Sequence, residues 1–263
     1  MKRLHVVGCH RSGTTLIFEL LTTCYEHTDH CEHEKTIFNP ITCDHGLYIG
    51  KKPSDITHIR KIFEADPDLY LIYMRRDPRA VVTSIHPSQG DIYFTSFERW
   101  MRYESAAKPL KSHPRFLEVC YEDLVTDPDQ VQLQIEETFP FLQRSHKFSE
   151  FHQYARTSKP AEISLKGVRP VAADQLRNWE KHLPRIAYQL QRYPRMADII
   201  VNYGYETNWE WLTMLAEVRP LPQGFGEKRP GWWKRVETDL RYYLKSLAYL
   251  RRRKQSQNIG QHQ

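Results

Sequence analysis

The sequence predicts an α/β fold with three layers, α/β/α, around a central, mostly parallel sheet. Three apolar segments of strand length, residues 4–7, 69–74 and 116–120, are each followed by a segment with helical character. Alternating strands and helices favour parallel strands, because each helix returns the chain to the same end of the sheet. The run 69–74 (LYLIYM) is apolar throughout, as expected for a strand buried on both faces.

The predicted helices have recognisable starts. Apolar residues recur at helical spacing after residue 14 and predict a helix over about 14–24. Asp77 and Asp127 each precede a proline, a typical N-cap and first-turn pair, and predict helices from 78 and near 129–139. Further helices are predicted around 56–63 and over about 93–110, 172–182 and 185–201, whereas residues 25–55 are expected to be irregular.

We expect residues 1–215 to form one domain and residues 216–263 to form a linker and a basic amphipathic appendage. Residues 232–254 combine two tryptophans, an apolar helical stripe and the run Arg251-Arg252-Arg253-Lys254. This pattern suits a helix lying on an anionic membrane, and equally a helix docked on the domain or on a second subunit. The sequence does not indicate an oligomeric state.

Composition narrows the class of protein. The net charge of +6 favours anionic ligands or surfaces, but one terminal basic cluster does not predict nucleic-acid binding. No apolar run approaches the roughly 18 residues of a membrane span. The glycine-bounded loop at residues 8–15 begins within ten residues of Met1, and we therefore expect no signal peptide before it. The five cysteines are not closely paired in the sequence, which fits reduced thiols. We therefore expect a cytoplasmic protein, with peripheral membrane contact through 232–254 as an open alternative.

The most informative segment is the loop at residues 8–15, Gly-Cys-His-Arg-Ser-Gly-Thr-Thr. It lies between a strand and a helix N-terminus, where free backbone N–H groups and the helix dipole favour an anion. Its G-x-x-x-x-G spacing is that of a P-loop, so the fold is predicted to be of the P-loop type. Thr14 stands where a nucleotide hydrolase needs Lys, and the cation is Arg11 instead.

A second anion site is predicted where the strand 69–74 ends, at the edge where open α/β sheets bind ligands. Arg76 offers a planar fork of donors at the strand end, and Ser84 offers a hydroxyl two turns into the following helix. Together they suit a phosphate.

The chain resembles sulfotransferases that use 3′-phosphoadenosine 5′-phosphosulfate. Residues 11–16 match that family's 5′-phosphosulfate loop, (R/K)-S-G-T-T-L; residues 76–84 match its 3′-phosphate motif, R-D-P-R-x-x-x-x-S; residues 121–128 match Y-E-D-L-V-x-D-P. The resemblance extends from residue 4 to about 205. It implies this donor as co-substrate, held by Arg11, Ser12, Gly13, Thr14, Thr15, Arg76, Ser84, Tyr121 and Arg169.

Within that superfamily the chain is similar to the tyrosylprotein-sulfotransferase-like and bacterial type. Matching segments are Cys31-Glu32-His33-Glu34, Lys51-Lys52-Pro53 and Arg169-Pro170-Val171. The resemblance implies Glu32 as general base, Lys51 as a cation beside the transferring group and Arg169 as a cation at the 5′-phosphosulfate. Glu34, His33 and His86 are alternative bases, and Ser164 is a weak candidate beside the sulfuryl group. His10 departs from the family pattern, which commonly has Pro before the loop cation.

The mechanism follows from charge. The acceptor hydroxyl, or an amine, would attack sulfur in line while Arg11, Lys51 and the loop N–H groups offset the charge on the leaving oxygen. A carboxylate would remove the hydroxyl proton, and this scheme requires no metal. Small-molecule, carbohydrate, lipid and peptide acceptors all agree with the motifs.

Three alternatives stay open. A P-loop small-molecule kinase is disfavoured by Thr14, and a membrane-associated non-catalytic module is disfavoured by the intact loop and Arg76–Ser84 motifs. Cysteine and histidine are frequent between 24 and 45, but their spacing matches no standard zinc site, and we expect a polar loop rather than a metal centre.

Overall fold

A five-stranded sheet forms the centre of the protein in the computed structural model, which describes residues 1–263 except 42, 44, 86–91, 223–230 and 260–263. Every strand pairs in parallel with its neighbour, in the order β2-β3-β1-β4-β5. The strands are β1 (Lys2–Gly8), β2 (Asp29–His30), β3 (Leu47–Lys51), β4 (Leu69–Arg75) and β5 (Phe116–Cys120). The predicted parallel α/β fold is therefore confirmed.

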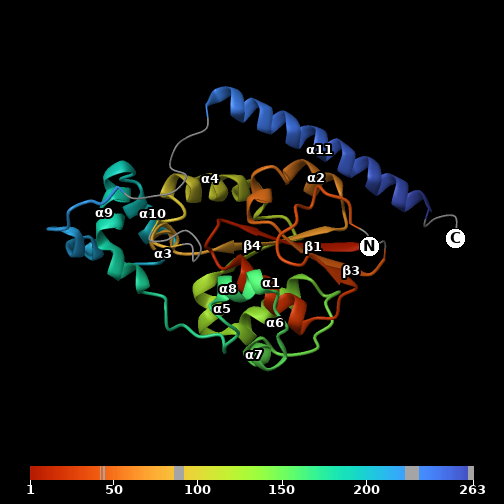
Figure 1. Cartoon of the computed structure of the whole chain (residues 1–263), viewed down its shortest axis with the longest axis horizontal. Helices are drawn as coiled ribbons and strands as arrows, with labels where there is room; N and C mark the ends of the chain where they lie inside the picture. The colour runs from red at the N-terminus through yellow and green to blue at the C-terminus, as the bar shows by residue number, and fades with distance from the viewer. Residues whose placement is uncertain (42, 44, 86–91, 223–230, 260–263) are drawn as a thin grey trace.

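Helices cover both faces of the sheet, as the three-layer prediction requires (Figure 1). Successive residues of β1 show why: Val6 packs in one apolar core and Val7 in the other. One face carries α1 (Thr14–Cys24), α5 (Tyr121–Thr126), α6 (Pro128–Thr138), α7 (Phe151–Tyr154) and α8 (Lys159–Leu165). The other face carries α2 (Arg60–Ala65), α4 (Phe97–Ala107) and, outside α2, the long helix α11 (Trp232–Ile259).

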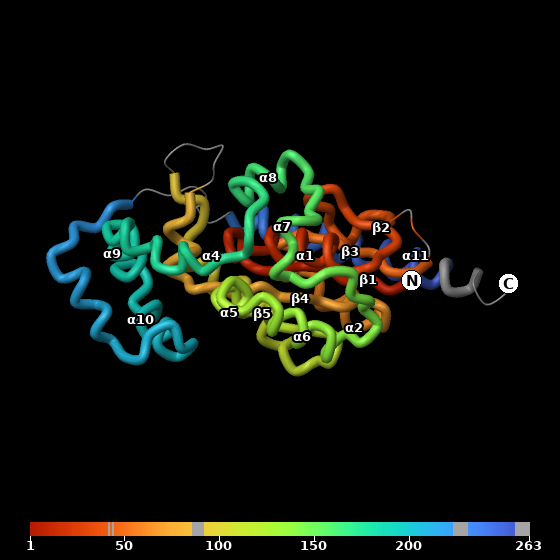
Figure 2. The backbone as a smooth tube through the Cα atoms, turned by 90° about the horizontal axis from the view of Figure 1, so that it is seen from below, coloured from red at the N-terminus to blue at the C-terminus, as the bar shows by residue number. Residues whose placement is uncertain are grey.

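A group of shorter elements extends the molecule beyond the carboxyl ends of the strands. It contains α3 (Pro78–Val82), α9 (Leu183–Arg192) and α10 (Met196–Asn202). Figure 2 shows α9 and α10 at the end opposite to the start of β1 and the end of α11. The 3₁₀ segments are η1 (Pro53–Thr57), η2 (Lys108–Leu110), η3 (Phe148–Glu150), η4 (Asn178–His182) and η5 (Glu210–Leu215).

The capping predictions are confirmed. The Asp77 carboxylate accepts a hydrogen bond from the Arg79 N–H at the start of α3, and the Asp127 carboxylate accepts one from the Gln130 N–H at the start of α6. The predicted helix 14–24 matches α1 in both bounds.

Four predictions of secondary structure are wrong. Ser84, expected two turns into the helix after Asp77, lies beyond α3, which ends at Val82. Residues 25–55 are not irregular, because they contain β3, which lies between β2 and β1 in the sheet. Gly50 and the buried Lys51 weaken its local strand pattern, and pairing with β1 decides its conformation. The helix expected over 172–182 is reduced to η4, and the helix expected over 185–201 is interrupted at Pro194, between α9 and α10.

The C-terminal half of α11 docks on the domain. Tyr249 is buried, and its hydroxyl donates to Asp66 at 2.5 Å. Arg253 is paired with Asp66 at 2.9 Å and with Asp68 at 2.5 Å, and Tyr242 stacks on His58 with ring centroids 3.9 Å apart. This part of the predicted appendage is therefore fixed to the domain, while the boundary at residue 215 stays a prediction. In the described part of the chain, every helix is too short or too polar to cross a bilayer.

Candidate active site

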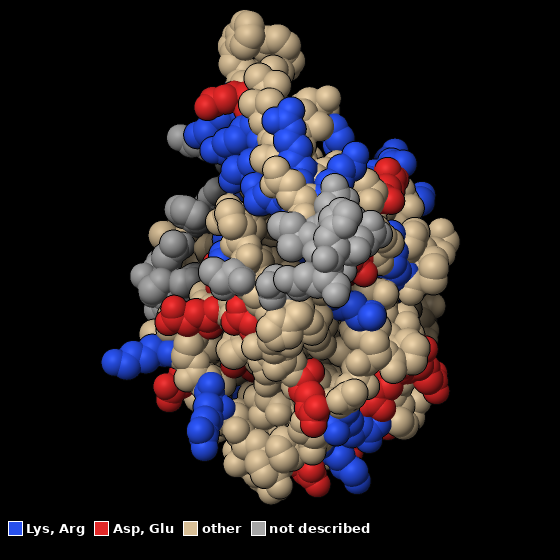
Figure 3. Space-filling model, turned by 90° about the vertical axis from the view of Figure 1, so that its right-hand side faces the viewer, with Lys and Arg blue, Asp and Glu red and all other residues tan. Residues whose placement is uncertain are grey.

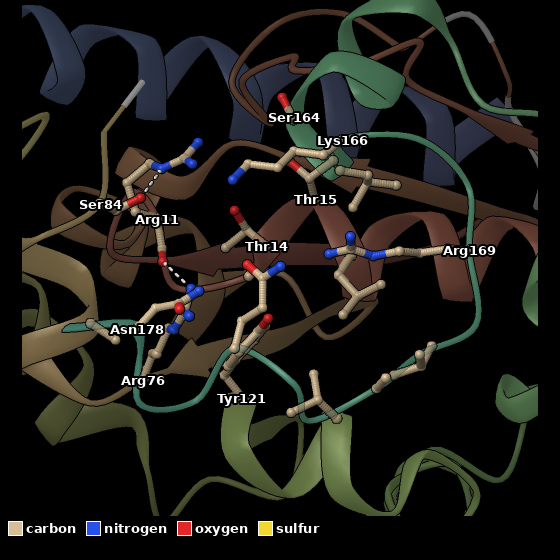
Figure 4. Close-up of a pocket in the computed structure, with 18 of the residues that line it drawn as sticks. Arg11, Thr14, Thr15, Arg76, Ser84, Tyr121, Ser164, Lys166, Arg169 and Asn178 are labelled. Carbon is tan, nitrogen blue, oxygen red and sulfur yellow. Dashed lines mark hydrogen bonds between the residues drawn. The ribbon is translucent and has the colours of Figure 1, made fainter. Parts of the chain in front are cut away.

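A cavity of about 420 Å³ lies beside the carboxyl ends of β1 and β4 and receives several of the predicted site residues. Figure 4 shows side chains pointing into it from the loop after β1, the segment after β4, the start of α5 and the segment after α8. Arg11, Gly13, Thr14, Thr15, Arg76, Ser84, Tyr121, Ser164 and Arg169 all line it. Two sequence motifs more than sixty residues apart therefore meet at one place.

The loop at 8–15 has the geometry of an anion cradle. Arg11 and Gly13 both have positive φ, 72° and 94°, and α1 begins directly after them at Thr14. The buried Ser12 hydroxyl donates to the Cys9 carbonyl at 2.6 Å and so closes the turn. The N–H groups of the first turn of a helix have no partner within the helix, and Thr14, Thr15 and Leu16 of this turn line the cavity.

Glycine is required at the end of this loop for two reasons. Its left-handed backbone disfavours a side chain. A Cβ atom on Gly13 would also lie 2.4 Å from Cδ2 of the Tyr121 ring. Gly13 therefore lets Tyr121, the first residue of α5, close one side of the cavity.

Arg11 and Ser84 are in direct contact. The Nε of Arg11 donates to the Ser84 hydroxyl oxygen at 2.7 Å, as the dashed line in Figure 4 marks. The sequence predicts two separate anion sites, one with Arg11 and one with Ser84, whereas these two side chains adjoin. Ser84 still has its own O–H to donate, because the hydroxyl oxygen only accepts in this bond.

Arg76 is the second cation of the cavity. Its guanidinium lies 3.9 Å from the centre of the Tyr121 ring, and Nη1 donates to the Arg11 carbonyl at 3.2 Å. Its Nε is buried and has no hydrogen-bond partner among the described residues. Burial and the nearby Arg76 charge both lower the pKa of Arg11, so the two cations repel each other where no anion lies between them.

Arg79, the other arginine of the same motif, has a structural role. It is buried and paired with Asp77 at 2.7 Å and with Glu206 at 2.6 Å, and it stacks on Trp179 at 4.0 Å. These contacts hold the start of α3, and with it Arg76, against the rest of the site. Trp179 accordingly packs in the apolar core and also lines the cavity.

Lys51 reaches the loop from β3. Its Nζ donates to the Thr15 hydroxyl at 3.1 Å and lies 3.5 Å from Nδ1 of His33. The side chain is buried, and burial lowers its pKa, against the opposing effects of Glu34 and Glu19. Lys51 is therefore a cation held beside the first turn of α1, although it does not line the main cavity.

The candidate bases lie outside the main cavity. Glu34 is paired with Lys52 at 2.8 Å, and the Lys52 charge lowers its pKa although burial opposes this. Glu32 lines a second cavity along α1, together with Phe18 and Glu19. His86, a further candidate, lies outside the described residues.

Glu19 was not singled out by the sequence analysis. It is buried one helical turn after Thr15, and burial raises its pKa to about 7 in spite of the Lys51 charge. A single glutamate on an amphipathic helix gives no sequence signal of this kind, because its burial depends on packing.

Further cavity residues come from the poorly patterned segment after α8. Arg169 lines the cavity as the resemblance implies, and Lys166, Lys181 and Asn178 join it from the same segment. Lys166-Gly167 has left-handed backbone at both residues, and the glycine was the available sign of a sharp turn. The cavity thus has five cationic side chains in its described lining and no Asp or Glu among them.

No group of three or more metal-ligating side chains comes together within the described residues. In the histidine-rich segment, His27 and His30 form a pair with ring nitrogens 2.9 Å apart.

Comparison with known proteins gives one family match, which contains the second and third of the three motifs. Residues 23–141 match the profile described as "Sulfotransferase family". The resemblance predicted from the sequence is confirmed for this region, and the match supports sulfotransfer as the general activity. The bacterial type fits, while the tyrosylprotein-sulfotransferase-like subtype stays a prediction. A search of curated proteins gave no match.

The solved structures to which the chain is similar include two bacterial proteins. The sulfotransferase domain of the olefin synthase from Synechococcus PCC 7002 is 16% identical, with a TM-score of 0.46, and 68% of this chain covers 86% of it. Sulfotransferase STF1 from Mycobacterium tuberculosis H37Rv is 12% identical, with a TM-score of 0.37, and 64% of this chain covers 72% of it. A retinol dehydratase in complex with androsterone and inactive cofactor PAP is 13% identical, with a TM-score of 0.31, and 95% of this chain covers 80% of it.

Proposed function

We propose that this protein transfers a sulfuryl group from 3′-phosphoadenosine 5′-phosphosulfate to a hydroxyl or amine acceptor. The observation that carries the proposal is the unpartnered, buried Nε of Arg76 in a cavity with cationic and no acidic lining among the described residues. A buried donor without a partner is costly, and an anionic ligand would satisfy it. A nucleotide with a phosphate at each end of its adenosine matches both the charge and the size of the cavity.

The orientation of the donor follows from the two anion sites. The 5′-phosphosulfate would lie at the N-terminus of α1, where Thr14, Thr15 and the free N–H groups converge, with Arg169 opposite. The 3′-phosphate would bind Arg76 and the Ser84 hydroxyl. Because Arg11 already contacts Ser84 at 2.7 Å, its guanidinium would be shared between the two ends of the nucleotide.

In this scheme the sulfuryl group passes directly from donor to acceptor without a covalent enzyme intermediate, and cationic side chains stabilise the charge that develops. The acceptor oxygen forms the new bond to sulfur as the bond from sulfur to the bridging phosphate oxygen breaks. The leaving group departs as adenosine 3′,5′-bisphosphate. Lys51 and Arg11 would offset its growing negative charge, and Lys51 is fixed beside Thr15 for this role. Protein cations therefore do the work assigned to metal ions in many phosphoryl transfers.

We propose Glu32 as the base that takes the acceptor proton. Glu34 is a weaker base, since its pairing with Lys52 lowers its pKa. Glu32 instead lines the second cavity, whose inner wall includes Phe18, the ring beneath Lys51 Nζ at 5.3 Å. The acceptor would thus approach along α1 through the second cavity and meet the sulfuryl group near Lys51.

The lining of the second cavity indicates the class of acceptor. The second cavity is lined by the carboxylates Glu19 and Glu32 and by polar groups that include His146, Arg156 and Ser158. Such a wall favours a polar acceptor with several hydrogen-bonding groups, such as a carbohydrate, a polar small molecule or a lipid headgroup, over an apolar one.

The test is transfer of radiolabelled sulfuryl from the donor into a cell lysate and into panels of hydroxylated and amine acceptors. Wild-type protein should label an acceptor, Arg11→Ala should abolish labelling, and Glu32→Gln should abolish labelling while adenosine 3′,5′-bisphosphate still binds. Glu34→Gln is the matched control and should retain most activity; the reverse result for the two glutamates would reassign the base.

The same preparation tests the alternatives. A rise in melting temperature with ATP but not with adenosine 3′,5′-bisphosphate would indicate a P-loop kinase. Vesicle binding without any nucleotide binding would indicate a membrane-associated module without catalysis.

A further inference from the structure

We propose that one face of α11 binds an anionic lipid surface and holds the protein peripherally at a membrane. The inference does not depend on the proposed sulfuryl transfer. It rests on an apolar stripe that the fold leaves exposed and on the charge that surrounds it.

The apolar stripe consists of large side chains on the N-terminal half of α11. Trp232 and Trp233 are 65% and 76% exposed, and the other members are each more than 40% exposed: Val236, Leu240, Tyr243 and Leu244. Their spacing of three or four residues places them along one side of the helix. Six neighbouring large apolar side chains in solvent form a contiguous patch, which in a soluble protein indicates an interaction site.

The opposite side of α11 is already occupied. Tyr242 stacks on His58, Tyr249 is buried, and Arg253 is paired with Asp66 and Asp68. The helix therefore cannot rotate to bury the stripe against its own domain without breaking a buried ion pair. Its orientation on α2, with the stripe outward, is set by these contacts.

The charge around the stripe is positive. From Trp232 to Ile259 the sequence has eight Lys or Arg and two Asp or Glu, and one of the eight, Arg253, is neutralised by Asp66 and Asp68. Arg251 and Lys254 are exposed near the C-terminal end of α11, and Lys61 of α2 lies over the Tyr243 ring at 3.8 Å. Figure 3 shows Lys and Arg gathered on the side of the molecule that carries this end of α11.

The positive charge favours an anionic membrane over a second copy of the chain as the binding partner of the stripe. A second copy of the chain, paired through the same stripe, would bring two helices with the same excess of positive charge together, and they would repel. An anionic bilayer surface attracts each Lys or Arg near it, while tryptophan and leucine enter the interface between headgroups and acyl chains. No segment need cross the bilayer for this.

The experiment is cosedimentation of the full chain with vesicles of phosphatidylcholine alone and of phosphatidylcholine with phosphatidylglycerol at 3:1. We expect strong binding only to the anionic vesicles, with binding lost as salt is raised. Leu240→Gln/Leu244→Gln should weaken binding by about tenfold or more, since each exposed leucine would lose its transfer into the interface. Leu133→Gln, at an exposed leucine of α6 on the other face of the sheet, is the matched control and should bind as wild type.

Equal binding to both vesicle types, or wild-type binding by the double leucine variant, would overturn the proposal. So would a dimer in light scattering that the double leucine variant dissociates, because the stripe would then be a subunit interface. The melting temperature of each variant with adenosine 3′,5′-bisphosphate, measured without lipid, separates these outcomes from a failure of the proposed transferase function.

Discussion

Replacing Arg76 with lysine tests the donor site most directly. The substitution keeps a positive charge at the end of β4 but removes the planar group that stacks on Tyr121 at 3.9 Å. Arginine presents two donors at once: Nη1, which donates to the Arg11 carbonyl at 3.2 Å, and Nε, which is free to bind the nucleotide. One ammonium group cannot occupy both positions.

The size of the effect follows from the bonds lost. A hydrogen bond to a charged group contributes about 1.5–3 kcal/mol. Loss of one such bond to the 3′-phosphate should therefore raise the dissociation constant of adenosine 3′,5′-bisphosphate about 10- to 150-fold. The free energy of unfolding should change less, since Nε has no protein partner to lose and the lysine ammonium can still donate to the Arg11 carbonyl, so that the stacking on Tyr121 is the main protein contact removed.

Isothermal titration calorimetry with adenosine 3′,5′-bisphosphate measures the dissociation constant, and urea titration measures the free energy of unfolding. Arg75→Lys is the matched control, because Arg75 is the adjacent residue but is bonded to Glu118 at 2.7 Å and Tyr205 at 2.8 Å, away from the cavity. It should lower stability and leave nucleotide affinity within about twofold of wild type, less than the loss of one hydrogen bond. The reasoning is refuted if Arg76→Lys binds the nucleotide as wild type does, or if Arg75→Lys weakens binding equally.

Three further outcomes are expected. Gly13→Ala should abolish nucleotide binding and lower the free energy of unfolding by about 2 kcal/mol or more, as read from urea titrations, because its Cβ would meet Tyr121 at 2.4 Å in a left-handed backbone. Arg253→Met should lower the free energy of unfolding by about 3 kcal/mol, because Asp66 would lose its charged partner. The variant should also show faster proteolysis of α11, and an unchanged digestion pattern would contradict the docking. Burial lowers the pKa of His10 to about 4, so stability should fall by up to about 3 kcal/mol as the pH decreases from about 6.5 to about 4, where the unfolded chain alone gains the proton. His10→Asn should flatten this slope, and an identical slope in both proteins would rule out His10 as its source.

Much of this site was predictable because its geometry is local. The loop at 8–15 has its glycine, its hydroxyls and its cation within eight residues, and the helix that completes the anion site follows immediately. Asp77 and Asp127 likewise cap helices that begin at the next residue. Where the structure depends on partners far away in sequence, prediction failed. The strand β3 was missed because its stability comes from pairing with β1 and β2, and its own residues include a glycine and a lysine.

By itself, the sequence determined the alternation of strands and helices, the position of the anion loop and the family that the motifs indicate, since each depends on residues close together in the chain. Only the tertiary structure decided that Arg11 contacts Ser84, that Glu19 is buried, and that Glu32 and Glu34 face different surroundings. It also decided which side of α11 is docked and which is exposed. The physical reason is that burial and charge pairing are properties of the packed molecule, in which side chains far apart along the chain exclude water from one another.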